Sequence, residues 1–535
     1  MMKVTQIPFK DTGFFSTTML DYLEQKEAIQ SFYNNFPDNV GFHNQIEEKE
    51  NSYNLQSRLV LVAALKKQYT TAIVSEKTKE NIELLKLKNT FTVTTGHQLN
   101  LFTGPLYFLY KIICAINLSE ELSVKFPNKN VVPVYWMATE DHDFEEINYF
   151  NFEGKKVKWS RDFEGEDSGA VGRFSTEGLE VVLDVFATQL GSSKNAKYLK
   201  ELFSKGYLKH SNLADATRYI ANELFKEYGL IIVDGDDKAL KKRFVPFIKD
   251  ELENQTSYKE VSKTISKLED NYKIQVSPRE INLFYLGKNF RERILFENGV
   301  YSVNNTYITF SKDEILKEVE ENVLAFSPNV IMRPLYQEVI LPNICYLGGG
   351  GEIAYWFELK AYFEKVNIPF PILLLRNSVQ VISEKQQKKL ENLHISTEDI
   401  FLKQHKLLSK KVLENTAIEI DFNEKIKYLE IHFAELKEVA KKTDISFANA
   451  VNAQERKQIK GLENLQKRLI IAEKRRQKDL VERITALQNE ILPNQSLEER
   501  QRNFSEYYLA YGDSFIKALK KALKPLNLEF TILEL

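Results

Sequence analysis

The chain has few of the residues that mark secreted, metal-bound or disordered proteins. Its 535 residues include only two cysteines, Cys114 and Cys345, each within an apolar segment and neither in a CxxC pair. This count excludes a disulfide framework and a thiolate zinc site. Glycine and proline are also scarce, at 21 and 14 residues, whereas 43% of the chain is hydrophobic. Such a composition is typical of a globular protein and not of a disordered one.

A strong net charge and long apolar runs are missing as well. The formal net charge is −2, so the chain lacks the basic footprint of a nucleic-acid-binding protein. Residues 1–19 lack the apolar core and cleavage site of a signal peptide. The longest apolar stretches, such as "IPFPILLL", fall short of the ~20 residues that span a bilayer. We therefore expect a cytoplasmic protein with no nucleic-acid partner and no membrane contact.

The chain exceeds the size of one ordinary domain, and its texture changes along its length. Residues 1–90 predict an N-terminal helical segment, because apolar residues recur at helical spacing. From residue 91 to 383, short apolar runs alternate with helices, and we predict strands at 91–95, 131–138, 229–234, 329–334 and 370–375. This alternation indicates an α/β fold with a Rossmann-like, doubly wound parallel sheet. Mixed polar sequence at about 150–210 and 240–325 predicts two insertions into this core.

Residues 384–500 predict a coiled-coil arm of two long helices folded back on each other, since apolar residues recur there at heptad spacing. The strand-like tail at 501–535 is expected to return to the core. Ile459, Ile470 and Ile471 lie beside the main heptad, so we expect a homodimer in which the arm contributes to the interface. The alternative is that these isoleucines pack on the chain's own core.

The first candidate site is "TTGHQLNLFTGPLYFLYK", residues 94–111, which predicts a strand, a loop and the start of a helix. Backbone N–H groups in such a loop favour an anion, although the segment is neither GxGxxG nor a Walker A loop. The candidate binding residues are Gly96, His97, Gln98, Gly104, Tyr107 and Lys111. The alternative for the last two is a surface lysine beside a core tyrosine.

Three further segments follow predicted strands or lie near them. "ATEDHDFEEIN" supplies Glu140, Asp141, His142 and Asp143, a titratable set suited to general base work, amine recognition or Mg²⁺ binding. Its alternative is a solvated acidic loop. "YLGGGGEIAYWFELK" supplies Gly348, Gly349, Gly350, Gly351, Glu352, Tyr355 and Trp356, where glycines let a ligand approach the backbone or let a strand pack tightly on a helix. Arg333, Gln337, Arg376 and Asn377 are candidates for binding carboxylate or phosphate.

These segments together resemble one family. "TGHQLNLFTGPLYFLYK", "VPVYWMATEDHDFEEIN", "LADATRYIANELFKEYGLIIVD", "REINLFYL", "RPLYQEVILPNICYLGGGGEIAYW" and "LLLRNS", in this order ahead of a coiled coil, look like the bacillithiol biosynthesis cysteine-adding enzymes. The resemblance implies a Rossmann-like core with connective insertions, a coiled-coil domain and a homodimer. It also implies a ligase that joins cysteine to glucosaminyl-malate, the last step to bacillithiol.

That family is in turn similar to class I cysteinyl synthetase-like ligases, which activate cysteine with ATP. The HIGH and KMSKS motifs of those ligases are absent. Residues 102–105 stand in the expected HIGH position and residues 376–378 in the KMSKS region, and the thiolates of a cysteine-selecting zinc site are lacking.

Two hypotheses follow. In the first, the chain is an ATP-using amide ligase with His97, Asp141 and His142 as catalytic residues. Loop amides, His97 and Arg376 would donate to the α-phosphate. ATP is then a co-substrate, Mg²⁺ is a further candidate and zinc is not expected. In the second, the core is a catalytically degenerate ligand-binding scaffold within a dimeric coiled-coil interaction protein. A synthetase acting on tRNA is disfavoured by the net charge.

Overall fold

The computed structural model describes residues 2–70, 74–161, 169–418 and 420–535. The chain divides into two compact units. The first contains Met1–Lys10, Phe14–Gln380 and Glu498–Leu533, and the second contains Asp11–Gly13, Val381–Leu497 and Glu534–Leu535. Across the described ranges, no helix is both long and apolar enough to cross a membrane.

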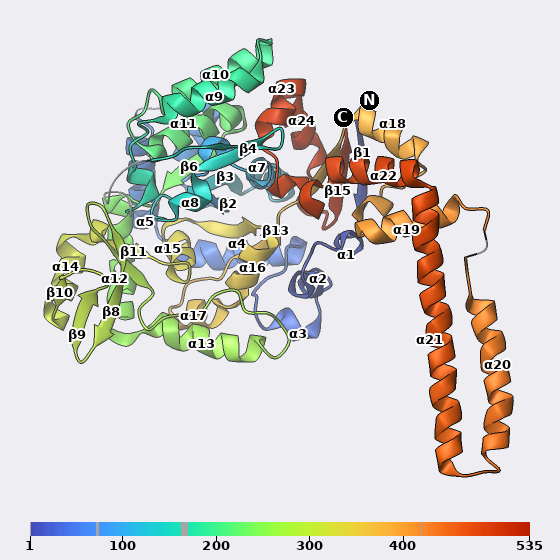
Figure 1. The fold of residues 1–535 in the computed structure, drawn as a ribbon. Coiled ribbons are helices and arrows are strands. Elements are labelled where there is room, and N and C mark those ends of the chain that lie inside the picture. The colour runs from blue at the N-terminus through green and yellow to red at the C-terminus, as the bar shows by residue number, and fades with distance from the viewer. Residues whose placement is uncertain (1, 71–73, 162–168, 419) are drawn as a thin grey trace. The chain divides into compact units, whose positions relative to one another are not determined.

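The first unit is built on a five-stranded parallel sheet (Figure 1). Its order is β13 (Ile372–Leu375), β12 (Asn343–Gly348), β2 (Thr90–His97), β3 (Asn130–Met137) and β6 (Ile231–Asp234). All neighbouring strands pair in parallel. Strands β3 and β6 follow β2 on one side of the sheet, and β12 and β13 are added later on its other side. The direction of the strand order therefore reverses between β2 and β12. The predicted Rossmann-like parallel sheet is confirmed.

One predicted strand is wrong. Residues 329–334 lead into a helix, α15 (Met332–Ile340), and the fifth strand of the sheet is β12 instead. The Asn329 side chain accepts the backbone N–H groups of Ile331 and Met332 at 2.8 and 3.3 Å, and Pro334 suits the first turn of the helix. Arg333 and Gln337 therefore lie on a helix and not at a strand end.

Helices surround the parallel sheet. The N-terminal segment forms α1 (Phe9–Thr12), α2 (Thr17–Leu23), α3 (Glu27–Gln30), α4 (Asn39–Ser52), α5 (Leu55–Gln68) and α6 (Glu76–Leu84). The helices that follow or connect strands are α7 (Tyr107–Lys125), α8 (Phe144–Ile147), α11 (Leu213–Phe225), α12 (Lys238–Asn254), α16 (Gly350–Phe357) and α17 (Lys360–Lys365). Helix α7 is buried along most of its length, as expected for a helix that covers a sheet.

The predicted insertion regions contain small sheets and helices of their own. The first has β4 (Tyr149–Phe152), β5 (Lys155–Lys158), α9 (Leu179–Leu190) and α10 (Lys194–Tyr207). The second has α13 (Thr256–Leu268), α14 (Lys312–Glu321) and an antiparallel sheet in the order β10 (Thr309–Phe310), β9 (Val300–Val303), β8 (Arg291–Glu297), β7 (Leu283–Leu286) and β11 (Phe326–Pro328). The hairpin between β8 and β9 turns at Asn298 and Gly299, both with positive φ.

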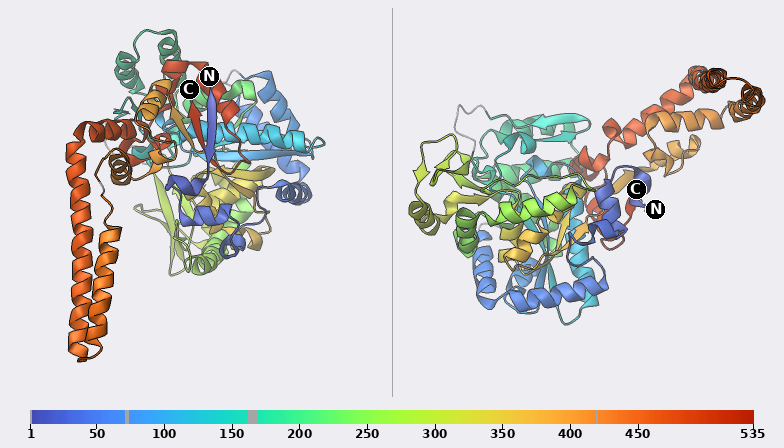
Figure 2. Two further views of the ribbon diagram at one scale, coloured as in Figure 1. Left: turned by 90° about the vertical axis from the view of Figure 1, so that its right-hand side faces the viewer. Right: turned by 90° about the horizontal axis from the view of Figure 1, so that it is seen from below.

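The second unit is helical, with α18 (Glu384–Asn392), α19 (Gln404–Glu414), α20 (Asn423–Ala440), α21 (Ile445–Arg476) and α22 (Lys478–Ile491). Helices α20 and α21 run antiparallel, side by side (Figures 1 and 2). Phe433, Ala440 and Val451 form their core, with Leu429 and Ala448 packed against it. The predicted coiled coil is confirmed.

The C-terminal helices α23 (Phe504–Tyr511) and α24 (Asp513–Ala522) belong to the first unit. The last strand, β15 (Phe530–Glu534), lies between β1 (Lys3–Ile7) and β14 (Val379–Ile382) in a three-stranded sheet.

Candidate functional site

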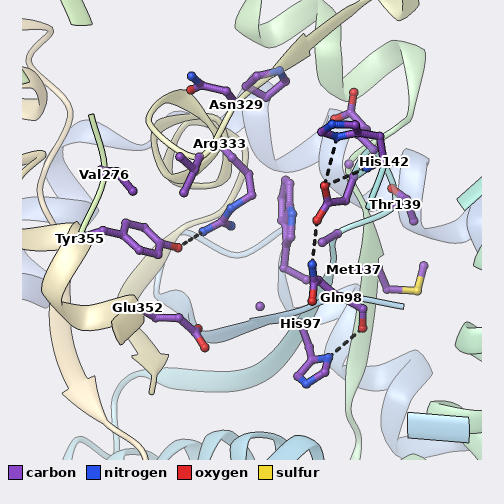
Figure 3. Close-up of a pocket in the computed structure, with 18 of the residues that line it drawn as sticks. His97, Gln98, Met137, Thr139, His142, Val276, Asn329, Arg333, Glu352 and Tyr355 are labelled. Carbon is purple, nitrogen blue, oxygen red and sulfur yellow. Dashed lines mark hydrogen bonds and ion pairs between the residues drawn. The ribbon is translucent and has the colours of Figure 1, made fainter. Parts of the chain in front are cut away.

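A cavity of about 590 Å³ opens at the carboxyl ends of β2, β3 and β6 (Figure 3). Ligands of open α/β sheets bind at this edge. Of the residues predicted from the sequence, the cavity wall contains Gly96, His97, Gln98, Tyr107, Lys111, Glu140, Asp141, His142, Arg333, Glu352 and Tyr355. Three segments that lie far apart in the chain therefore meet in one place.

The other predicted residues lie outside this wall. They are Gly104, Asp143, Gln337, Gly348, Gly349, Gly350, Gly351, Trp356, Arg376 and Asn377. Gly104 lines a second cavity of about 330 Å³, which shares Gln98 and Tyr107 with the first and also contains Arg500.

The glycine run at the start of α16 is explained in part by packing. A Cβ on Gly350 would lie 3.1 Å from Cγ of Met19, and one on Gly348 would lie 3.1 Å from Cβ of Glu352. Both distances are tighter than ordinary contacts, so larger residues would push these neighbours away. The tight-packing alternative therefore accounts for Gly348 and Gly350. At Gly351 a Cβ would meet nothing within 4 Å.

Three of the outlying residues have structural partners. Asp143 caps the first turn of α8. Gln337 is buried and donates its side-chain N–H to Glu338 at 3.0 Å. Trp356 is buried with its ring centroid 4.6 Å from that of Tyr346. These contacts hold the side chains in place around the site.

Arg376 is engaged inside the first unit. Its Nη1 and Nη2 atoms donate to the two carboxylate oxygens of Glu499 at 3.0 and 2.7 Å, and both side chains are buried. Asn377 donates to the carbonyl of Lys524 at 3.0 Å. Because a bidentate ion pair uses the face of the guanidinium that would bind a phosphate, this geometry does not favour Arg376 as a phosphate donor.

His97 has a fixed tautomer. Its Nδ1 lies 2.7 Å from the carbonyl oxygen of Gln98, which can only accept, so Nδ1 carries the proton. The buried Nε2 has no hydrogen-bond partner within the described residues. Burial, reinforced by the Lys111 ammonium, lowers the pKa of His97 to about 3. The neutral ring therefore offers a lone pair, and not the donor that the sequence suggested for a phosphate.

Lys111 and Glu352 form an ion pair at the base of the cavity. The Lys111 ammonium donates to Oε1 of Glu352 at 2.5 Å and to the Gly96 carbonyl at 2.8 Å. Burial lowers the pKa of Lys111. Burial also opposes the ionisation of Glu352, but the Lys111 charge outweighs it and lowers the pKa of this carboxyl. Lys111 is therefore not the surface lysine of the alternative interpretation.

Gln98 joins the first candidate segment to the acidic one. Its side-chain N–H group donates to Asp141 at 2.9 Å and to Glu146 at 2.8 Å. Burial tends to raise the pKa of Asp141, but hydrogen bonds from Gln98 and His142 and the charge of Arg291 hold it well below the ordinary value. Asp141 is thus an ionised carboxylate on the cavity wall and a weak base.

His142 is held by an arginine that the sequence analysis missed. Nη1 of Arg291 lies 2.9 Å from Nδ1 of His142. Since a guanidinium has no acceptor, Nδ1 must accept this bond, and a neutral His142 then carries its proton on Nε2. The contact between Nδ1 and Asp141, at 3.6 Å, is too long for a hydrogen bond. This arrangement presents an N–H donor at His142.

Arg291 and Arg333 are cations on the cavity wall whose described partners are all uncharged. Arg291 is 9% exposed and also donates to Ser327 and to the Pro328 carbonyl. Arg333 donates to Tyr355 at 3.0 Å and to Gln337 at 3.3 Å. Within the described chain neither guanidinium pairs directly with a carboxylate. A guanidinium on a cavity wall that forms no direct ion pair with a protein carboxylate suits the carboxylate or phosphate of a ligand.

The acidic side of the cavity is anchored by a network of ion pairs. Lys241 contacts Glu140 at 2.5 Å and Asp236 at 3.2 Å, and Arg173 contacts Asp236 at 2.7 Å. Burial and the nearby charge of Asp236 raise the pKa of Asp234 to about 6. Lys241 therefore ties Glu140 of the segment "ATEDHDFEEIN" to α12, whereas His142 and Asp143 of the same segment are exposed.

Sequence reasoning missed the wall contributed by the second insertion. Val276, Ser277, Arg279, Phe284 and Arg291 line the cavity, yet they come from the region predicted only as an insertion, and Asn329 comes from the segment predicted as a strand. An arginine on a strand of alternating polarity gives no sign of which site it faces. The only available signal was the resemblance segment "REINLFYL", which ends just before this arginine.

Metal binding has no evident site. Among the residues that the structure describes, no group of three or more His, Cys, Asp or Glu side chains could hold a metal ion.

Comparison with known proteins covers the whole chain. Residues 2–377 match "Bacillithiol biosynthesis BshC, N-terminal Rossmann-like domain", and residues 379–535 match "Bacillithiol biosynthesis BshC, C-terminal coiled-coil domain". A protein of Flavobacterium johnsoniae named "Putative cysteine ligase BshC" is 56% identical over 98% of this chain and 99% of its own length. Proteins of the same name from Flavobacterium psychrophilum and Christiangramia forsetii are 55% and 52% identical, each over 99% of both chains.

A likeness to a solved structure is weak. A chain titled as a putative arginyl-tRNA synthetase from Campylobacter jejuni matches 83% of this chain and 97% of its own, at 10% identity and a TM-score of 0.22. This score is too low to support an argument.

Proposed function

Because this chain belongs to the bacillithiol biosynthesis BshC family, we propose that it is a ligase that joins L-cysteine to the amine of glucosaminyl-malate through an amide bond. ATP would activate the cysteine carboxyl group. Relatives that are more than half identical over nearly the full length are named cysteine ligases, which supports the reaction class. The proposed location is the cytoplasm, where ATP is available.

The observation that carries the proposal is the charge pattern of the 590 Å³ cavity. Arg291 and Arg333 lack carboxylate partners in the described chain, whereas Glu140 and Asp141 hold negative charge nearby. The substrates carry complementary groups: carboxylates on cysteine and on the malyl group, phosphates on ATP and amines on cysteine and on the sugar. Guanidinium groups bind carboxylates and phosphates, and carboxylates bind ammonium.

The proposed chemistry has two steps. A carboxylate oxygen of cysteine attacks the α-phosphorus, the bond to the β-phosphate oxygen breaks and pyrophosphate leaves. The sugar nitrogen then attacks the acyl carbon, the bond to the phosphate oxygen breaks, AMP leaves and the amine loses its proton. Positioning and charge stabilisation would supply most of the rate enhancement. Mg²⁺ would enter as its complex with ATP, because this ion is usually held by substrate phosphates and one or two carboxylates.

Individual side chains take the following roles in this proposal. Arg333 and Arg291 bind carboxylates or phosphate oxygens. Asp141 holds an ammonium group and is too weak a base to deprotonate it efficiently. His97 accepts a hydrogen bond through Nε2, and His142 donates one through its own Nε2.

The test is mass spectrometry of the purified protein after incubation with cysteine, glucosaminyl-malate and ATP. We expect the amide-linked thiol together with AMP. ADP in place of AMP would replace the adenylate with an acyl phosphate. Folded protein that yields no thiol product would contradict the proposed reaction.

Variants tie the reaction to the cavity. Arg333→Met should lower kcat/KM by about 100-fold, because it removes a charged hydrogen-bond donor from the substrate. Arg293→Met is the control, since it makes the same change at an arginine of β8 that does not line the cavity. Replacing Asp141 or His142 with alanine should leave folding intact and abolish product formation. If a variant turns over substrate as fast as the unmodified protein, the replaced residue has no role in the reaction.

We also propose that the protein is a homodimer and that the arm contributes to the interface. Within the second unit, Tyr428, Ile431, Val439, Leu465 and Ile471 leave about half or more of their surface exposed. Apolar residues on one coiled-coil arm suit a second copy. Deleting residues 420–490 with a short linker should give a monomer by light scattering. A deletion variant that stays dimeric would place the interface on the α/β unit.

A further inference from the structure

A second candidate ligand site lies at the opposite edge of the parallel sheet from the proposed catalytic cavity. It is a cavity of about 340 Å³ between α4, α5, α12 and the end of α15. Its polar wall includes Lys49, Ser57, Lys242, Arg243 and Glu338, and Tyr53 and Phe247 contribute aromatic surface. None of these residues lines either cavity at the carboxyl edge.

Lys49 gives this cavity a buried cation with spare donors. The side chain is 1% exposed, and within the described residues it pairs with Glu338, with Nζ 3.3 Å from Oε2. An ammonium group has three N–H donors, and this single contact is longer than an ordinary charged hydrogen bond. Burial lowers the pKa of Lys49, although the Glu338 carboxylate acts in the opposite direction.

Two further cations line the same cavity from α12. Arg243 is half-buried and donates through Nη2 to Ser57 at 2.9 Å, which fixes the guanidinium and leaves its other donors available. Lys242 is exposed beside it. In the part of the chain that the structure describes, neither side chain forms an ion pair with a carboxylate. With Lys49 they set three positive charges against the single carboxylate of Glu338.

We propose that this cavity binds a small anionic molecule whose carboxylate or phosphate group contacts Lys49 and Arg243 and whose apolar part rests on Tyr53 and Phe247. The charge balance selects an anion, since a neutral ligand would leave the Lys49 donors unused. The volume suits a molecule of metabolite size and excludes a polypeptide. This site does not depend on the proposed ligase reaction.

The site also has a physical link to the catalytic cavity. Helix α15 carries Glu338 at the one site and Arg333 at the other. Gln337 lies between them, donating to Glu338 at 3.0 Å and accepting from Arg333 at 3.3 Å. A ligand that draws Lys49 away from Glu338 would act on a hydrogen-bonded chain that ends at Arg333.

Isothermal titration calorimetry of the full-length protein tests the site, with inorganic phosphate and succinate as separate probes at low ionic strength. We expect saturable binding of at least one probe, and the tighter probe identifies phosphate or carboxylate as the preferred group. The Arg333→Met variant should retain this binding, because its altered cation lies in the other cavity. The double variant Lys242→Ala, Arg243→Ala should bind about tenfold more weakly or worse.

The matched control is Lys238→Ala, an exposed lysine on the same helix that does not line the cavity. It should bind like the unmodified protein, and circular dichroism should show all variants folded. If neither phosphate nor succinate binds saturably to the Arg333→Met variant, the proposal is wrong. Equal affinity in the double variant and the unmodified protein would overturn it as well.

Discussion

Two buried lysine–glutamate pairs lie at opposite edges of one parallel sheet, and they differ in what surrounds them. Lys111 and Glu352 face the large cavity, and the Glu352 side chain is 29% exposed. Lys49 and Glu338 are 1% and 0% exposed. The pKa of Glu352 is lowered despite burial, because of Lys111, whereas burial raises the pKa of Glu338.

The difference separates a pair open to a ligand from a pair that is part of the core. Glu338 is compensated by neutral groups, since it accepts from Asn343 at 2.7 Å and from Gln337 as well as from Lys49. Glu352 instead lies among positive charges, and its remaining partner is the Tyr346 hydroxyl at 2.9 Å. Similar residue pairs thus differ both in solvent access and in the charges around the carboxylate.

The largest expected effect comes from breaking the Lys49–Glu338 pair, which lies at the edge of the sheet opposite the large cavity. Lys49→Met leaves Glu338 buried without a counter-charge, so we expect the free energy of unfolding to fall by about 3–5 kcal/mol. Denaturant unfolding measures this loss. Lys129→Met is the control, because Lys129 pairs with Glu50 at 2.6 Å in a half-exposed position where an ion pair contributes about 1 kcal/mol or less. Equal losses in the two variants would contradict the distinction between core and surface pairs.

Breaking the Lys111–Glu352 pair should lower the free energy of unfolding by a smaller amount. Lys111→Met removes hydrogen bonds to Glu352 and Gly96, but Glu352 is open to water, so we expect a loss of about 2 kcal/mol. The same variant should lose the proposed ligase activity. Lys125→Met removes an exposed lysine from the same helix and serves as the control. A loss as large as that of Lys49→Met would mean that both pairs belong to the core.

The fold was readable from the sequence because its signals are local. The strands at 91–95, 131–138, 229–234 and 370–375 are continuous apolar runs, and each coincides with a strand of the parallel sheet. The error at 329–334 arose where a capping asparagine and a proline outweighed an apolar run. Such side-chain bonding cannot be seen in a periodicity count.

The site was readable only in part, because cavity walls depend on long-range contacts. Residues at strand ends, such as His97 and Asp141, could be grouped by the rule that ligands bind at that edge. Arg291 could not, since its position follows from how the second insertion folds. The proton positions on His97 and His142 are set by Gln98 and Arg291, and spacing carries no information about either.

The pH dependence of the free energy of unfolding tests one group at the carboxyl ends of the strands, His97. The pKa of His97 is about 3 in the folded protein and near 6.5 when exposed, so the unfolded chain binds an extra proton between these values. Stability therefore falls as the pH drops from about 6.5 toward 3, by up to about 1.4 kcal/mol per pH unit from this group.

His97→Gln should flatten that slope, as measured by denaturant unfolding at several pH values from 4 to 7. His43→Gln, which replaces an exposed histidine on α4, is the control. If the pH profiles of His97→Gln and the unmodified protein are parallel, the pKa of His97 is the same in the folded and the unfolded chain, which contradicts the prediction.

The last expected effect concerns Glu358, a buried carboxylate with no lysine or arginine partner in the described chain. It accepts the backbone N–H groups of Gln275 and Val276 at 2.7 and 3.3 Å, and Val276 lines the large cavity. Burial raises the pKa of Glu358 to about 7, so the folded state binds more protons than the unfolded state between about pH 4.5 and 7. Its contribution to stability is therefore lost as the pH rises through this window, in the opposite sense to His97.

Glu358→Gln removes this titration but keeps one acceptor oxygen for the two N–H groups. The variant should be less stable than the unmodified protein at pH 5, and the difference should shrink toward pH 8, by up to about 1.4 kcal/mol per pH unit between about pH 4.5 and 7. Denaturant unfolding at both pH values measures the change. Glu364→Gln, an exposed change on α17, is the control. A constant difference between the two pH values would mean that Glu358 titrates alike in the folded and unfolded chains, and that a buried carboxylate here needs no cation to stay ionised.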